Sequence, residues 1–426
     1  MRCPACCVPL RLRTPGDEIV CACAYACACL LLSAARCVLT GGVTDVVQVL
    51  GRIPANINGL ALGTVSLGVT WQTAAEILEF PPALKLWTDL ISLLTLNIAG
   101  SLVLLYLCKV VVAPAALKRD LEMPDTAAIL CTLDMTLMSM SWVLSRHGVH
   151  STGLVIWGVA VTMHAAILAM FSFHLLPRAP SPGFPWQAFQ PAWMIPPIGI
   201  CMASGTGRAL GMGPWVEVFF YIGLLAFVFL LPAAIYRVHF WEDPLPEHLQ
   251  PTIAIIAAPC ALLLCQWVAI GGNERHSITH ALFVGELLCV GFVARHVPTF
   301  LRLPLSRHHA AFTFPADIST KGVMIYSSLF LETSGLSLLR LCLAPIWTLP
   351  VLSLARAFRA LRPLRAWFGP ERARDRERAR EQECARERER ERKRALLEPV
   401  CQGQRGPGSV LCGCLVHVCE CACVRE

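Results

Sequence analysis

Ionisable side chains inside otherwise apolar stretches are the residues of this sequence best placed to do chemistry. Asp134, Asp317 and Lys321 are the main candidates, and Glu286 is a further one. A charged group inside a membrane segment is costly, and it usually marks the path of an ion or proton. Asp317 and Lys321 stand four residues apart, so on a helix they could instead neutralise each other near its aqueous end. A role in a permeation path and a local ion pair are therefore both open.

A second candidate is the stretch Phe312-Thr313-Phe314-Pro315. A proline within a helix leaves the carbonyl four residues earlier, here that of Ala311, without its usual partner. Within a membrane, such a carbonyl is tolerated only where protein or water satisfies it. A bulky ring at that bend could close a narrow water path. The alternative is a bent helix whose phenylalanines face lipid or the protein core.

Motifs of enzymes and metal sites are absent or incomplete. The sequence contains neither H-E-x-x-H nor G-x-S-x-G. The pairs His147/His150 and His276/His280 have suitable spacing for a metal but no adjacent acidic pair. We therefore expect no catalytic residue, metal site or cofactor, with a membrane enzyme using His147 and His150 as a minor alternative.

The composition defines the class of protein. Of the 426 residues, 55% are hydrophobic and only 15% are charged, whereas soluble domains average about 45–50% and about 25%. Many apolar windows approach the roughly 20 residues that cross a bilayer. The sequence therefore predicts an all-α, polytopic protein in the lipid bilayer. It has no basic surface module of the kind that binds nucleic acid, so no nucleic-acid partner is expected.

The two ends differ from the body. Most of the 22 cysteines lie near the termini, so they do not form a disulfide framework across the body. Residues 1–50 form an irregular Cys-rich leader, within which residues 19–35 are a signal-peptide core, an extra span or a translated nucleotide repeat. Residues 51–359 are predicted to form a single ten-helix transmembrane domain. Residues 360–426, with alternating Glu and Arg followed by further cysteines, form a tail that we expect to be disordered.

Ten membrane-spanning helices, arranged as five hairpins, are expected within the body. Their predicted ranges are 57–73, 87–110, 127–144, 153–173, 192–208, 215–237, 252–271, 278–293, 308–328 and 336–358.

Prolines and small residues separate these spans into two classes. The fifth, seventh and ninth spans contain the predicted kinks Pro196, Pro197, Pro259 and Pro315. Proline and small residues suit helices that line a cavity or cross closely, and unbroken apolar helices suit the outer wall. We therefore expect the odd-numbered helices to form an inner pore ring. The loops on the side of both termini carry more Lys and Arg than the opposite loops, which predicts cytoplasmic termini.

Four sequence pieces carry a family resemblance. In chain order they are Arg52-Ile53-Pro54-Ala55, Pro191-Ala192-Trp193-Met194-Ile195-Pro196-Pro197-Ile198-Gly199, the run from Leu249 to Pro259, and Phe312-Thr313-Phe314-Pro315. Together they resemble the tellurite-resistance/dicarboxylate transporter family, which includes bacterial tellurite-resistance channels, the yeast malate permease and plant slow anion channels.

The resemblance implies five helical hairpins around one pore per subunit, homotrimers, and a phenylalanine that occludes the pore. Phe314 is the match by its position before the proline, and Phe312 is the reserve candidate. The resemblance also implies transport of a small anion such as malate or another C4-dicarboxylate, by a channel or a carrier in the plasma membrane. The competing hypothesis is a membrane scaffold or sensor that acts through its charged tail.

Overall fold

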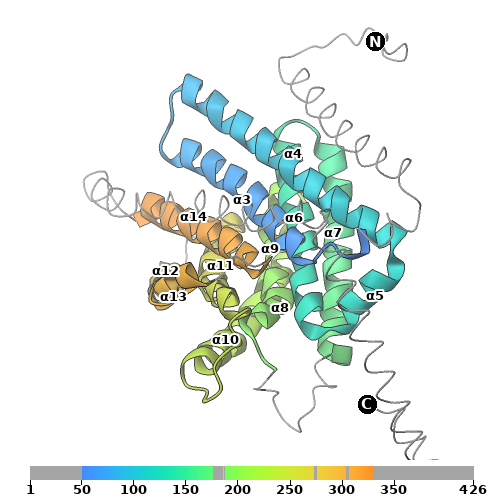
Figure 1. The fold of residues 1–426 in the computed structure, drawn as a ribbon. Coiled ribbons are helices and arrows are strands. Elements are labelled where there is room, and N and C mark those ends of the chain that lie inside the picture. Colours follow the sequence, from blue (N-terminus) through green and yellow to red (C-terminus); the bar gives the residue numbers. More distant parts are fainter. Residues whose placement is uncertain (1–49, 176–185, 187, 273–275, 304–306, 331–426) are drawn as a thin grey trace, which may run out of the picture. The chain divides into compact units, whose positions relative to one another are not determined.

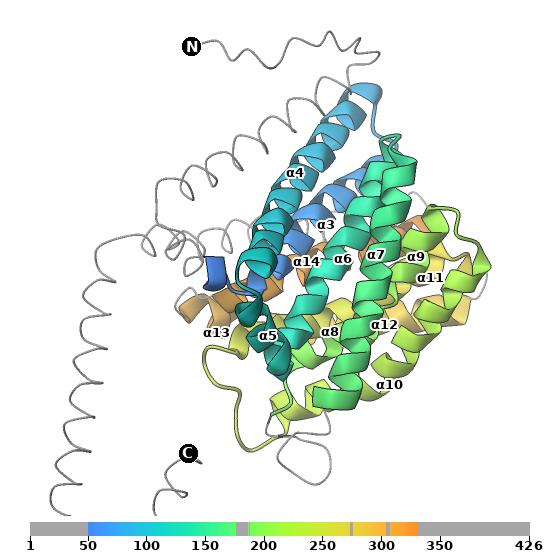
Figure 2. The ribbon, with the colours of Figure 1, turned by 90° about the vertical axis from the view of Figure 1, so that its right-hand side faces the viewer.

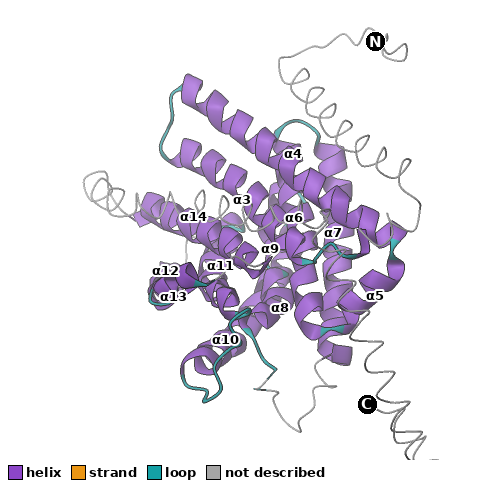
Figure 3. Ribbon diagram, viewed as in Figure 1, coloured by secondary structure: helices purple, strands orange, loops and turns teal. Residues whose placement is uncertain are grey.

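The computed structural model describes residues 50–175, 186, 188–272, 276–303 and 307–330. All of them belong to one unit, Met1–Leu361. These described residues form helices and loops without any strand (Figure 3). The tenth predicted span, the Cys-rich leader and the charged tail lie outside the described residues.

Seven long α-helices make up most of the described residues (Figure 1). They are α3 (Asn56–Ile77), α4 (Pro82–Val112), α6 (Pro124–Arg146), α7 (His150–Met170), α10 (Glu217–His239), α12 (His276–Ala294) and α14 (Thr313–Phe330). The shorter helical segments are α5 (Pro114–Glu122), η1 (Phe171–Leu175), η3 (Pro191–Met194), α8 (Ile195–Gly199), α9 (Met202–Ala209), η4 (Pro214–Val216), η5 (Gln250–Ala257), α11 (Ala258–Ala269), α13 (Val297–Arg302) and η7 (Arg307–Phe312).

The prolines expected to kink continuous helices lie instead at junctions between two helix types. A 3-10 segment precedes each one: η3 runs into α8 with Pro196 and Pro197, η5 into α11 with Pro259, and η7 into α14 with Pro315. In the first turn of an α-helix a proline removes no needed donor, and its fixed φ angle fits the helix. Within a 3-10 segment each carbonyl bonds three residues ahead rather than four. In the structure the bends expected at these prolines are therefore changes of helix type.

Close contact between α3 and α14 brings the two ends of the described chain together (Figure 1). The hydroxyl of Thr313 lies 3.3 Å from the carbonyl of Gly59. A Cβ atom added at Gly63 would lie 2.3 Å from the Cβ of Thr313. The Gly59-x-x-x-Gly63 pair thus leaves room for α14, in the way that small residues let membrane helices approach.

Six helical stretches are long and apolar enough to cross a membrane, among the residues described. They are Pro82–Val112, Pro124–Arg146, His150–Phe173, Pro214–His239, Gln250–Ala269 and Ser277–Ala294. Figure 2 shows α6 and α7 running side by side on the face turned toward the viewer. Large apolar side chains are exposed on α4, α7, α10 and α12, for example Leu94, Val155, Phe229 and Leu288. Such surface suits lipid rather than water.

Candidate functional site

A cavity of about 80 Å³ lies among segments that are far apart in the sequence. Its wall is built by α3, α6, the η3–α8 segment, the η5–α11 segment and the η7–α14 segment. The residues that line it are Asn56, Gly59, Leu62, Ile129, Thr132, Met135, Met194, Ile195, Ile198, Gly199, Thr252, Ile255, Ala258, Pro259, Leu262, Ala310, Ala311, Phe314 and Pro315. The helices α4, α7, α10 and α12 contribute none of these residues.

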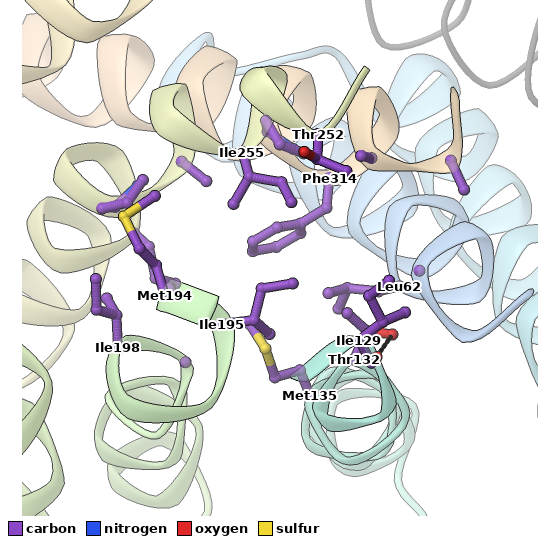
Figure 4. Close-up of a pocket in the computed structure, with 18 of the residues that line it drawn as sticks. Leu62, Ile129, Thr132, Met135, Met194, Ile195, Ile198, Thr252, Ile255 and Phe314 are labelled. Carbon is purple, nitrogen blue, oxygen red and sulfur yellow. Dashed lines mark hydrogen bonds between the residues drawn. The ribbon is translucent and has the colours of Figure 1, made fainter. Parts of the chain in front are cut away.

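Phe314 projects into this cavity from the first turn of α14. Its ring extends into the space between Ile255, Ile195 and Leu62 (Figure 4). Only 8% of the residue is exposed. The preceding 3-10 segment and the contact of Thr313 with Gly59 fix the backbone from which the ring projects. Phe314 is therefore held in place as part of the lining of an apolar space.

The described residues that line the cavity include few polar groups and no ionisable side chain. The hydroxyl of Thr132 donates to the carbonyl of Ile129 at 2.7 Å, and that of Thr252 donates to the carbonyl of Leu249 at 2.6 Å. Both hydroxyl protons are thus used within their own helical segments. A bare anion in such surroundings would pay a large desolvation penalty. An anion passing here would have to keep much of its hydration shell, and an apolar constriction of this kind can close by dewetting.

Phe312, the reserve candidate, is not part of the cavity wall. Its ring contacts Phe300 edge-on, with 4.9 Å between centroids, and stacks on His309 at 6.0 Å. It belongs to an aromatic cluster at the junction of η7 and α13. Phe312 and Phe314 thus have separate surroundings although only one residue lies between them.

Asp134 lies one layer behind the cavity wall. It is fully buried on α6, and its Oδ2 atom lies 3.2 Å from Nδ1 of His164 on α7. The other ring nitrogen of His164 lies 2.8 Å from the carbonyl oxygen of Pro196. Asp134 is therefore connected to the wall-forming α8 through His164, and it does not line the cavity itself.

Asp317 and Lys321 do not form the ion pair that their spacing suggested. Asp317 is 1% exposed, and it makes no salt bridge within the described part of the chain. Lys321 extends toward α6, where its ammonium lies 5.9 Å from the ring centroid of Trp142. The pair fails because Asp317 faces the protein interior while Lys321 turns to an aromatic ring, so Asp317 is not at an aqueous end. Neither residue lines the cavity.

Glu286 on α12 is a second buried carboxyl group. It is fully buried, and a Cβ atom at Gly322 of α14 would lie 2.5 Å from its Oε2. Gly322 therefore leaves the space that this side chain fills. It too lies outside the cavity wall.

Two of the histidines considered for metal binding contact hydroxyl groups in the described part of the chain. His150 lies 2.8 Å from the hydroxyl of Ser145, and His280 lies 2.8 Å from the hydroxyl of Tyr326. Burial lowers the pKa of His147, an effect that Arg146 adds to and Asp89 opposes. The side chain of His276 is outside the described part.

The structure instead groups Cys131, Asp134 and His164, whose potential ligand atoms lie within 4.8 Å of one another. Sequence reasoning missed this group because its members come from two helices. Cys131 and Asp134 are three residues apart and share a face of α6, which was the available signal.

The sequence was also compared with known protein families and with curated proteins. Residues 52–358 match the family model of SLAC1, described as voltage-dependent anion channel. A search of curated proteins found no match. The matched range includes every segment that lines the cavity and covers well over half of the chain. The resemblance inferred from the four sequence pieces is thereby confirmed: the chain belongs to the SLAC1 family of polytopic membrane proteins, whose members transport anions through a channel or transporter.

Proposed function

We propose that this protein carries small anions across a membrane along a path through the cavity, and that the ring of Phe314 closes this path. One observation carries the proposal: a single phenylalanine projects into an apolar space bounded by segments from the whole length of the described chain. Because the described residues of the wall include no ionisable side chain, the open path would hold a hydrated anion weakly.

The proposed path uses the odd-numbered spans. The cavity-lining segments α3, α6, η3–α8, η5–α11 and η7–α14 correspond to the first, third, fifth, seventh and ninth predicted spans. The helices α4, α7, α10 and α12, which correspond to even-numbered predicted spans, carry most of the exposed large apolar side chains. This division supports an inner pore ring and an outer lipid-facing ring within a bundle of ten helices.

The proposed substrate is a small anion, with malate and other C4-dicarboxylates as the first candidates. We further propose a homotrimer in the plasma membrane with both termini in the cytoplasm. The family match supports anion transport in general. An anion panel in proteoliposomes, with malate, chloride and nitrate compared at equal gradients, identifies the preferred substrate.

The occluding role is tested by measuring anion current in planar bilayers or proteoliposomes. We expect Phe314→Ala to raise the current at least about tenfold, because truncating a buried ring removes the plug and the apolar surface that excludes water. Phe312→Ala is the matched control: it removes the same ring two residues away, from the cluster with Phe300 and His309. An equal current in wild type and Phe314→Ala would contradict the proposal, as would an increase in Phe312→Ala of the same size.

A further inference from the structure

Three buried side chains behind the cavity wall offer three different metal-ligating atoms. The sulfur of Cys131, a carboxylate oxygen of Asp134 and a ring nitrogen of His164 all lie within 4.8 Å of one another. None of the three residues has any exposed surface. A buried charge without compensation would strongly destabilise the fold. The group therefore needs a partner that matches its charge.

The polar atoms of this group have no hydrogen-bond partner among the described residues. This holds for both carboxylate oxygens of Asp134 and for Nδ1 of His164, although buried polar atoms are seldom left unsatisfied. Nδ1 and Oδ2 lie 3.2 Å apart. A tetrahedral zinc ion, with its ligand atoms at about 2.0–2.3 Å, holds neighbouring ligand atoms roughly 3.3–3.6 Å apart. The observed spacing is thus close to that of a metal site before any adjustment of the side chains.

The hydrogen bond on the other side of the His164 ring also suits a metal ligand. Its Nε2 atom lies 2.8 Å from the carbonyl oxygen of Pro196. Because a carbonyl oxygen only accepts hydrogen bonds, Nε2 carries the proton and donates it, and a neutral ring then presents the lone pair of Nδ1 to Asp134. Metal-ligating histidines usually donate their second ring N–H in this way, which fixes the tautomer and the orientation of the ring.

The types of ligand atom identify the metal as Zn²⁺. Sulfur of cysteine, nitrogen of histidine and oxygen of aspartate are all ordinary zinc ligands, whereas Ca²⁺ and Mg²⁺ prefer sets of oxygen atoms. A thiolate and a carboxylate supply two negative charges and the imidazole none, so a divalent cation leaves the buried group neutral. The second oxygen of Asp134 or a water molecule would complete a four-coordinate site.

We propose that Cys131, Asp134 and His164 bind one Zn²⁺ ion that joins α6 to α7 behind the cavity wall. Binding releases to solvent any proton held by the thiol or the carboxyl group. The ion fixes the ring of His164, which in turn holds the carbonyl of Pro196 in α8. The same ring lies against Gly199, where an added Cβ atom would be 3.3 Å from Cε1. The site does not depend on the proposed anion path, because none of its ligands lines the cavity.

Thermal unfolding with and without zinc tests the site in the full chain. The detergent-solubilised protein is stripped with a chelator, dialysed and divided into portions with and without added Zn²⁺, and loss of helix is followed by circular dichroism. We expect zinc to raise the midpoint of wild type by about 5 °C or more, since it binds only the folded group. In Asp134→Asn, which keeps the volume but loses the charge, we expect a shift below about 1 °C. A wild-type midpoint that does not respond to zinc would overturn the proposal.

A second measurement separates this site from zinc bound by other thiols, because the sequence contains 22 cysteines. Bound zinc per chain, measured by elemental mass spectrometry after dialysis, should fall by one equivalent in each of Cys131→Ala, Asp134→Asn and His164→Gln. Cys201→Ala is the matched control: it removes another fully buried thiol that is not part of the group, and it should keep both the zinc content and the zinc response of wild type. Equal zinc contents in the control and the three ligand variants would overturn the proposal, and any one folded ligand variant suffices for the comparison.

Discussion

Two strongly apolar stretches of this protein have different surroundings. In Gln250–Ala269, which contains η5 and α11, 83% of the most apolar window is buried within the protein, whereas in Pro214–His239, which contains α10, the share is 17%. The first stretch lines the cavity and the second does not. Hydrophobicity therefore shows that a helix belongs to the membrane, but not whether it faces protein or lipid. The residues that make the difference are small residues and prolines, which allow close contact, and large aliphatic and aromatic residues, which fill the lipid-facing surface.

The contrast between helices that face protein and helices that face lipid can be tested by substituting glycines. We expect the largest effect from these substitutions. In Gly63→Leu the new side chain must displace Thr313, because even a Cβ atom would lie 2.3 Å from the Cβ of that residue. We expect loss of most of the folded protein, measured as the yield of monodisperse material after detergent extraction, since overpacking at a fixed helix contact cannot be relieved locally. The control is Gly158→Leu on α7, where an added Cβ would meet nothing within 4 Å. Equal yields of the two variants would contradict the inner and outer assignment.

A smaller effect is expected from removing leucine side chains in the same two regions. Leu263 on α11 is fully buried, whereas Leu225 on α10 is 64% exposed. We expect Leu263→Ala to lower the free energy of unfolding by about 2–5 kcal/mol through loss of contacts and formation of a cavity. Leu225→Ala, facing lipid, should change it far less. Unfolding in mixed micelles measures both, and a larger loss in Leu225→Ala would show that α10 packs against protein.

A third test concerns the buried carboxyl group of Asp317. The energy to be measured is its coupling energy with Lys321, which we expect to be smaller than the loss of stability in Leu263→Ala. Because Lys321 turns to Trp142, a double-mutant cycle of Asp317→Asn and Lys321→Met should give a coupling energy below about 0.5 kcal/mol. A coupling energy above about 1 kcal/mol, the range of residues in contact, would restore the ion pair that the sequence suggested.

The smallest expected effect concerns His147, in the loop between α6 and α7. Burial lowers its pKa in the folded protein, so the unfolded state binds the proton more readily. Stability from the neutral ring is therefore fully present above the unfolded pKa of about 6.5 and is lost as the pH falls below it. We expect the thermal midpoint of wild type to decrease more than that of His147→Gln between about pH 7 and about pH 5.5. Parallel decreases in the two proteins would show that His147 does not contribute.

Much of this architecture could be predicted from composition and from the positions of proline and glycine. Long apolar stretches identified membrane helices, and the motif pieces around Pro196, Pro259 and Phe314 identified the family. The 3-10 segments before these prolines could not be predicted, because the pattern of apolar residues is the same for a bent α-helix and for a change of helix type. Pro232 within α10 also shows that proline alone does not mark a cavity-lining helix.

The side-chain partners were harder to predict than the helices. Spacing along one helix suggested a pair between Asp317 and Lys321, but neighbouring helices decided where each side chain points. The contact between Asp134 and His164 joins two helices and a backbone carbonyl of a third segment. Such contacts depend on how the helices are rotated against each other, which the order of residues in one helix does not determine.

In the proposed mechanism anions pass the position of Phe314, and covalent modification of this position tests that passage most directly. In Phe314→Cys, a negatively charged methanethiosulfonate reagent should attach a bulky anionic group within the path. We expect the anion current of this variant to fall after labelling and to recover when a thiol reductant removes the label, while wild type, with its 22 native cysteines, keeps its current. Complete labelling of the introduced thiol, verified by mass spectrometry, with an unchanged current would contradict the account.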